Sequence, residues 1–283
     1  MLESLIKYSY LRYALVSGIL LSIVCGVIGV IIIEKKMVMM SGGIAHISYG
    51  GVGLGYLLGF EPIIGAFLFA ILSAFGIGFL KKKNGLNTDI ILGLLWPLGM
   101  ALGVIFIYMI PGYAPNIESY LFGNILSITK LDLILIVVLS VIILFSVIMF
   151  FNSWKSFLFD EEFASINKMK TGFLEYFLLV LIAMAIVVAI KATGIILVIA
   201  LLTAPSAASK LMSSSLKNRM IISSLFGIFY TICGLVFSYY FNIPTGATIV
   251  ILSVIGYFIV FLIFKIVEKK RLKKELSHEW LRK

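Results

Sequence analysis

His46 is the side chain in this sequence best suited to chemistry, because it lies inside a long stretch without charged residues. The segment Met37–Gly59 contains no Asp, Glu, Lys or Arg and is long enough to cross a bilayer core of roughly 30 Å. A titratable ring at that depth is costly unless it faces protein, water or an ion. We therefore interpret His46 as a candidate metal ligand. The alternative is a histidine that hydrogen-bonds across a helix contact.

Small and hydroxyl-bearing residues surround His46. Four glycines lie near it at helical spacings, namely Gly42, Gly43, Gly50 and Gly53. A face with so little bulk either meets another helix closely or lines a narrow path. Ser48 and Tyr49 are candidates to add oxygen ligands, although hydroxyls in membrane helices commonly serve packing or bond to the backbone.

A ladder of glycines follows at Gly51, Gly55 and Gly59. Small residues at every fourth position let two helix backbones approach each other. We predict that this ladder packs against another helix of the same chain. The alternative is a seam between two copies.

Membrane-spanning helices must position these residues. The chain is 61% hydrophobic, its mean hydropathy is +1.14, and its apolar runs repeatedly reach the spanning length. We predict an all-α, polytopic transmembrane bundle of eight or nine spans, in which an N-terminal segment (1–12) precedes a single transmembrane domain (13–266) and a basic cytoplasmic tail (267–283). The candidate spans are Tyr13–Ile33, Met37–Gly59, Pro62–Leu80, Ile90–Ile110, Leu131–Phe151, Phe173–Ala192, Gly194–Leu211, Met220–Phe241 and Ala247–Phe264.

The net charge of +10 comes from basic residues in alternate loops. Lys and Arg gather near residues 35–36, 81–83, 155–170 and 210–219 and in the tail, whereas Pro111–Tyr120 and Asn242–Gly246 contain none. This is the positive-inside pattern. It predicts a cell-membrane protein with a cytoplasmic C-terminus and, for nine spans, an external N-terminus. It argues against nucleic acid as the partner, while the tail suits anionic lipid.

Motifs for several enzyme classes are missing from the sequence. It has no GxxxxGK[ST] phosphate loop and no HExxH, and its second histidine, His278, lies in the tail. Cys25 and Cys233 lie in candidate spans, and neither is part of a CxxC motif. This favours the interpretation that both act as small buried apolar residues. We predict a conduit that takes its energy from another subunit. A secondary transporter or channel is the alternative, and a membrane enzyme using His46 as a base lacks a nucleophile.

Several segments, in order along nearly the whole chain, resemble the zinc/manganese permeases of ATP-binding-cassette importers. They are SGGIAHISYGGVGLGYLLG, TDIILGLLWPLGMALGVIFI, ESYLFGNILSIT, FDEEFA, IALLTAPSAASKLMSSSLKNRM and YYFNIPTGATIVIL. One departure is specific. The family usually carries an Asp four residues before the histidine, where this sequence has Gly42. An Asp and a His one helical turn apart share a face and jointly suit a divalent cation.

The resemblance implies the permease subunit of an importer for divalent metal ions. Zinc is slightly favoured because imidazole suits it, and manganese, iron and cobalt stay open. Two copies would form a homodimer around a central path, a cytoplasmic ATP-binding subunit would hydrolyse ATP, and an extracellular metal-binding protein would deliver the ion. The chain itself would bind no cofactor, and the metal ion would pass only transiently.

The resemblance also implies a docking element for the ATPase. We predict it in Pro205–Arg219, where a proline interrupts a span and a short basic connection follows. The alternatives are a simple positive-inside hairpin or docking through the loop Phe159–Lys170. The predicted docking residues are Ser209, Lys210, Lys217 and Arg219.

Overall fold

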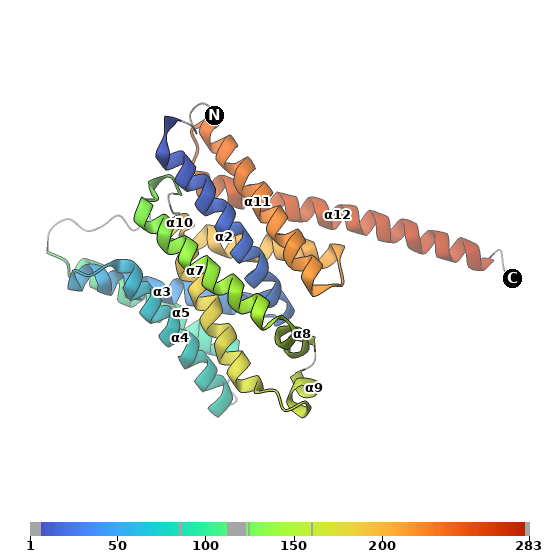
Figure 1. The fold of residues 1–283 in the computed structure, drawn as a ribbon, viewed down its shortest axis with the longest axis horizontal. Coiled ribbons are helices and arrows are strands. Elements are labelled where there is room, and N and C mark those ends of the chain that lie inside the picture. Colours follow the sequence, from blue (N-terminus) through green and yellow to red (C-terminus); the bar gives the residue numbers. More distant parts are fainter. Residues whose placement is uncertain (1–6, 85–86, 112–122, 124, 160, 281–283) are drawn as a thin grey trace.

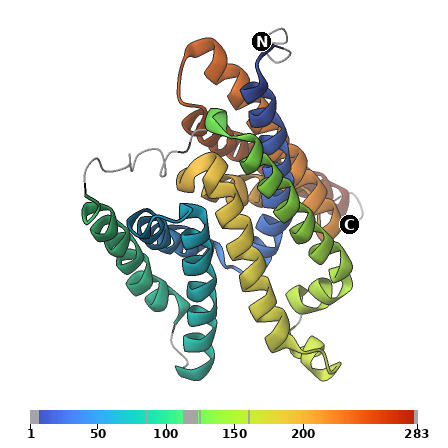
Figure 2. The same ribbon diagram turned by 60° about the vertical axis from the view of Figure 1, so that its left-hand side comes forward.

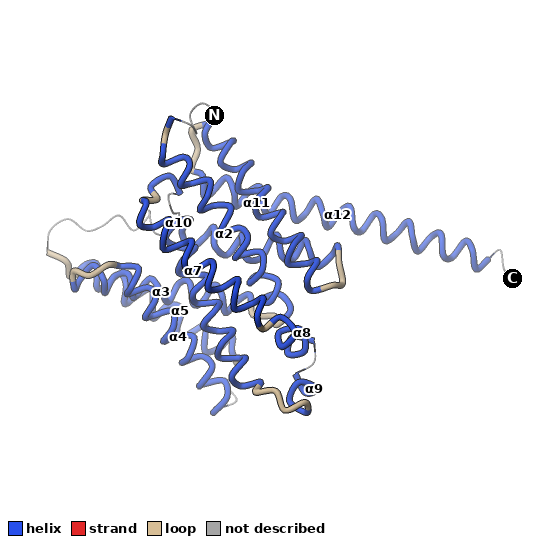
Figure 3. Tube along the Cα trace, in the orientation of Figure 1, coloured by secondary structure: helices blue, strands red, loops and turns tan. Residues whose placement is uncertain are grey.

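The structure is a computed structural model that describes residues 7–84, 87–111, 123, 125–159 and 161–280. All regular structure in these residues is helical, which confirms the predicted all-α bundle (Figure 3). The long helices are α2 (Ser9–Glu34), α3 (Val38–Leu58), α4 (Pro62–Asn84), α5 (Thr88–Tyr108), α7 (Lys130–Met149), α10 (Thr171–Met212), α11 (Leu216–Phe241) and α12 (Thr245–Trp280). The shorter ones are η1 (Ile125–Ser127), α8 (Phe151–Phe159) and α9 (Glu161–Ile166).

Seven of the helices in the described residues are long and apolar enough to cross a membrane: α2, α4, α5, α7, α10, α11 and α12. The predicted span Met37–Gly59 forms α3 but is absent from this group, because glycine and His46 lower its hydropathy. The predicted outer loop Pro111–Tyr120 lies outside the described residues except for Pro111.

The 42-residue element α10 is two helical arms that meet at Gly194, whose φ of 75° and ψ of 165° favour glycine. Near its start, Glu175 pairs with Lys81 of α4. Near its end, Lys210 pairs with Glu34 of α2. Lys35, which follows Glu34, lines one cavity together with Lys81 and Glu175. Both ends of α10 therefore lie at the same end of the bundle, here called the basic end, and the chain reverses at Gly194. The two predicted spans that meet at this glycine are the two arms.

The helices form two groups joined by α10. Helices α3, α4 and α5 lie together on one side of the molecule, and α2, α7, α11 and α12 form the other side (Figures 1 and 2). Helix α10 contacts both groups. Figure 1 shows α12 leaving the bundle, and the predicted tail begins inside this helix, which continues to Trp280.

Glycine contacts hold α3 against its two neighbours. A Cβ atom at Gly51 would overlap the backbone of Gly65 in α4, and one at Gly53 would lie 2.6 Å from the carbonyl oxygen of Gly103 in α5. Gly55 packs on Pro62 in the same way. The prediction that this ladder packs within the chain is thus confirmed for Gly51 and Gly55, whereas Gly59 ends α3 in the left-handed conformation.

Replacing Gly51 tests the crossing of α3 and α4. Gly51→Ala is expected to cost about 1–3 kcal/mol of stability, because the added Cβ forces two backbones apart. Gly76→Ala is the matched control, since nothing lies within 4 Å of a Cβ at Gly76 in α4. Thermal unfolding of the detergent-solubilised protein measures both variants. Equal midpoints for the two would contradict the role of this crossing.

Candidate functional site

His46 is the one residue between Met40 and Gly53 of α3 whose side chain is not fully buried. Its ring stacks on Trp96 of α5, with centroids 4.3 Å apart and an interplanar angle of 17°. The Nδ1 atom is buried and has no hydrogen-bond partner among the described residues. The imidazole therefore opens to the surface of the chain beside an indole.

The predicted supporting residues do not share this opening. Ser48 is fully buried, and its hydroxyl donates to the carbonyl oxygen of Ala45 at 2.6 Å. Tyr49 is buried, and its ring packs against Gly103 of α5. Both side chains lie inside the protomer, whereas His46 is half-buried at its edge.

Gly42 lies one helical turn before His46 and has space beside it. A Cβ atom there would lie 3.7 Å from Ile199 and 3.9 Å from the Trp96 ring, which are ordinary contacts. In the described part of the chain, no group of three or more His, Cys, Asp and Glu side chains is placed to hold a metal. One protomer thus contributes a single strong ligand at this position.

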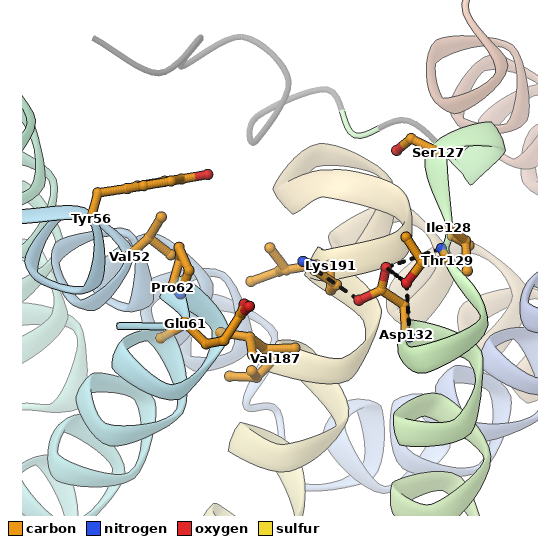
Figure 4. A pocket seen from close by; sticks show the side chains of 13 residues that line it. Val52, Tyr56, Glu61, Pro62, Ser127, Ile128, Thr129, Asp132, Val187 and Lys191 are labelled. Carbon is orange, nitrogen blue, oxygen red and sulfur yellow. Dashed lines mark hydrogen bonds and ion pairs between the residues drawn. The ribbon is translucent and has the colours of Figure 1, made fainter. Parts of the chain in front are cut away.

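A cavity of about 480 Å³ lies at the end of the bundle opposite the basic end. Figure 4 shows Tyr56 and Glu61 on its α3–α4 side and the Asp132–Lys191 pair on its α7–α10 side. The Lys191 ammonium lies 3.5 Å from the Asp132 carboxylate, and Asp132 also closes a capping box with Thr129 at the start of α7. We call this space the Asp132 cavity.

Sequence reasoning missed the Asp132 cavity. The available signal was the position of Glu61, Asp132 and Lys191 at the ends of three candidate spans, away from the basic loops. The folded chain brings these ends together because α3 and the first arm of α10 both run from the basic end toward this cavity.

Two of the predicted docking residues bind a carboxylate within the chain. Glu34, the last residue of α2, accepts a hydrogen bond from Arg219 at 2.5 Å and lies 3.3 Å from the Lys210 ammonium. Arg219 also donates to the carbonyl oxygen of Ser213. These contacts clamp the short connection between α10 and α11 onto α2. Glu34 was not anticipated from the sequence.

The other two predicted docking residues differ in accessibility. Ser209 is fully buried and donates to the carbonyl oxygen of Ser206 at 2.8 Å, so its side chain does not reach the surface of this chain. Lys217 is exposed.

The short helix α8 forms a second feature of the basic end. Trp154 and Phe157 of α8 are fully buried. Trp154 stacks on Phe177 of α10 with centroids 5.8 Å apart. The ammonium of Lys35 lies 3.5 Å from the centre of the Phe157 ring. These contacts anchor α8, and α9 follows it directly in the chain.

Relatives of this sequence match it over most of its length. Residues 7–264 match the ABC 3 transport family. The chain belongs to this family. It is 35% identical to the manganese transport system membrane protein MntC of Listeria monocytogenes, over 92% of this chain and 93% of that protein. It is 30% identical to the manganese import system permease protein ScaB of Streptococcus gordonii, over 93% of this chain and 94% of that protein.

Solved structures agree with the fold. The chain superimposes on one from PsaBC of Streptococcus pneumoniae in complex with Fab, with a TM-score of 0.84, 32% identity and coverage of 92% and 94%. A putative metal-chelate type ABC transporter in an inward-facing conformation gives a TM-score of 0.73 at 15% identity, which concerns the fold alone. The family confirms the resemblance found in the sequence. The protein is a multi-pass membrane permease of the ATP-binding-cassette type, in which ATP hydrolysis belongs to a separate subunit.

Glu34→Gln tests the clamp at the basic end. The substitution leaves the Arg219 side chain, which is 11% exposed, without its carboxylate partner. We expect the protein to lose about 1–3 kcal/mol of folding stability. Glu175→Gln is the matched control, because it breaks an ion pair to Lys81 whose side chains are 51% and 27% exposed; this loss should stay below about 1 kcal/mol. Thermal unfolding ranks the two variants. The reverse order would contradict the clamp.

Proposed function

We propose that this permease imports a divalent transition-metal ion, with manganese as the first candidate, along a path lined by His46. The observation that carries the proposal is that α3 is buried from Met40 to Gly53 except at this imidazole. The names of the relatives MntC and ScaB support manganese. Zinc is the second candidate, because imidazole suits it.

A second copy of the chain completes the path in this proposal. One His46 is too few ligands for a metal ion, and two copies around an axis would bring two imidazoles together. Water or hydroxyl oxygens would complete the coordination of a divalent ion. The half-buried His46 and Trp96 then face the partner rather than lipid, which removes the cost of exposing an imidazole to hydrocarbon.

We propose a topology of nine crossings, with α3 and the two arms of α10 each counted as one. The positions of the helix ends support it, since α2, α4 and the second arm of α10 all end at the basic end, at Glu34, near Lys81 and near Lys210. Under the positive-inside rule this end is cytoplasmic. The N-terminus is then outside, α12 runs inward, and the C-terminus is cytoplasmic. The Asp132 cavity faces outward.

The two ends take different partners in this proposal. A cytoplasmic ATP-binding subunit docks at the basic end, on the α10–α11 connection that carries the exposed Lys217. An extracellular metal-binding protein releases its ion over the Asp132 cavity, where the carboxylates of Glu61 and Asp132 suit a cation. Membrane lipid covers the apolar outer faces of the helices.

His46→Ala tests the path directly. We expect ATP-driven manganese uptake into vesicles holding the full complex to fall to background, because the imidazole is the strong ligand that each copy offers. Assembly should persist, since the glycine-rich face tolerates a smaller side chain.

Wild-type uptake would also weaken as pH falls through the imidazole titration, because a protonated ring cannot ligate. Gly42→Asp, which has room for a Cβ, should strengthen divalent-ion binding. Normal uptake by His46→Ala would move the path elsewhere.

Lys217→Glu tests docking without disturbing the Glu34 clamp. Reversing Lys210 or Arg219 would also break their ion pairs to Glu34, so the exposed Lys217 is the informative position. We expect Lys217→Glu to weaken the coupling of ATP hydrolysis to uptake in reconstituted complexes. Lys155→Glu on the exposed side of α8 is the comparison. Loss of coupling in Lys155→Glu alone would move the docking surface to α8 and α9.

Cysteine labelling tests the topology. In a Cys25→Ala, Cys233→Ala background, Asn242→Cys should react with an impermeant thiol reagent added to intact cells. Lys217→Cys should react only after the cells are opened, because the two positions lie at opposite ends of α11. Labelling of Lys217→Cys from outside would invert the orientation.

A further inference from the structure

Trp96 lies against the ring of His46. The two rings are nearly parallel and their centroids lie 4.3 Å apart. They come from different helices, since His46 lies in the middle of α3 and Trp96 in the middle of α5, one residue before Pro97. Both side chains are half-buried. The indole therefore covers one face of the imidazole, and of the two ring nitrogens Nδ1 is the one buried without a partner in the described part of the chain.

A metal-binding histidine is ordinarily oriented by a hydrogen bond at its second ring nitrogen. Here Nδ1 is buried without such a partner among the described residues. The residues one turn before and after His46 on α3 are Gly42 and Gly50, which offer no side chain to restrain it. The contact described for the ring plane of His46 is the stack on Trp96.

We propose that Trp96 is a positioning residue for metal recognition at His46. The parallel indole holds the imidazole so that Nε2 can ligate the ion. Its π face also stabilises the partial positive charge that the ring acquires when it binds a cation. This inference rests on the proposed function, because it assigns a role at the same site.

Two variants distinguish the effect of the aromatic face of Trp96 from the effect of its size. Trp96→Leu keeps an apolar side chain but removes the stack, whereas Trp96→Phe keeps a ring that can lie on the imidazole. Leu94→Ala is the matched control, because Leu94 is on the same helix and 69% exposed. His46→Ala is measured in parallel.

The experiment uses the complete complex and manganese(II) alone as the probe. The dissociation constant is obtained from the electron paramagnetic resonance signal of the free ion, and the maximal rate of ATP-driven uptake is measured in proteoliposomes. We expect Trp96→Leu to raise the dissociation constant about 10-fold or more, the usual effect of removing the group that orients a ligand. Trp96→Phe should restore most of the affinity, and Leu94→Ala should match the wild type.

Three outcomes would overturn the proposal: wild-type affinity in Trp96→Leu, equal losses in Trp96→Leu and Trp96→Phe, or a loss confined to the maximal rate. If Trp96→Leu does not assemble, Trp96→Met replaces it as the apolar variant and the same criteria apply. The proposed function fails separately, through normal uptake and affinity in His46→Ala. An inactive His46→Ala beside a fully active Trp96→Leu would reject the stacking role alone.

Discussion

Close backbone contact at glycines is the constraint on which the arrangement of α3 depends. Gly51 meets Gly65 of α4, and Gly53 meets Gly103 of α5, at distances that no Cβ atom permits. Lipid provides no hydrophobic driving force between helices, so the association of membrane helices depends on dense packing. They bury α3 on most sides, although its hydropathy is too low to place it among the evident spans. The result is a helix that is buried from Met40 to Gly53 except at His46.

Ion pairs in the described residues lie at the two ends of the bundle, and a carboxylate takes part at each end. At the basic end, Glu34 gathers Lys210 and Arg219 onto the end of α2. At the opposite end, Asp132 caps α7 and pairs with Lys191 of α10. Charged groups are costly in hydrocarbon, and in the middle of the bundle the imidazole of His46 stacks on the indole of Trp96. In the proposed function, the two ends contact other proteins and the middle lets the ion pass.

Much of the architecture was predictable because the membrane imposes a simple length and polarity pattern. The spans corresponding to α2, α4, α5, α7, α11 and α12, and the reversal near Gly194, follow from apolar runs and their boundaries. The site was predictable only in part. His46 stood out as a polar residue within an apolar run, but the run could not show that Ser48 and Tyr49 point into the protomer. Nor could loop composition show that Lys210 and Arg219 bind Glu34, because that carboxylate lies far away in sequence.

The sequence by itself therefore determined the class of protein, the long helices and the family, and it predicted His46 as the residue to hold an ion. Each of these depends on local composition or on ordered motifs, which need no knowledge of long-range contacts. Tertiary structure alone decided which side chains meet. The stacking of Trp96 on His46, the clamp at Glu34 and the cavity between Glu61 and Asp132 all join different helices. Their geometry depends on how glycine contacts set the crossings of those helices and on where Gly194 turns the chain back, and neither property can be read from one segment.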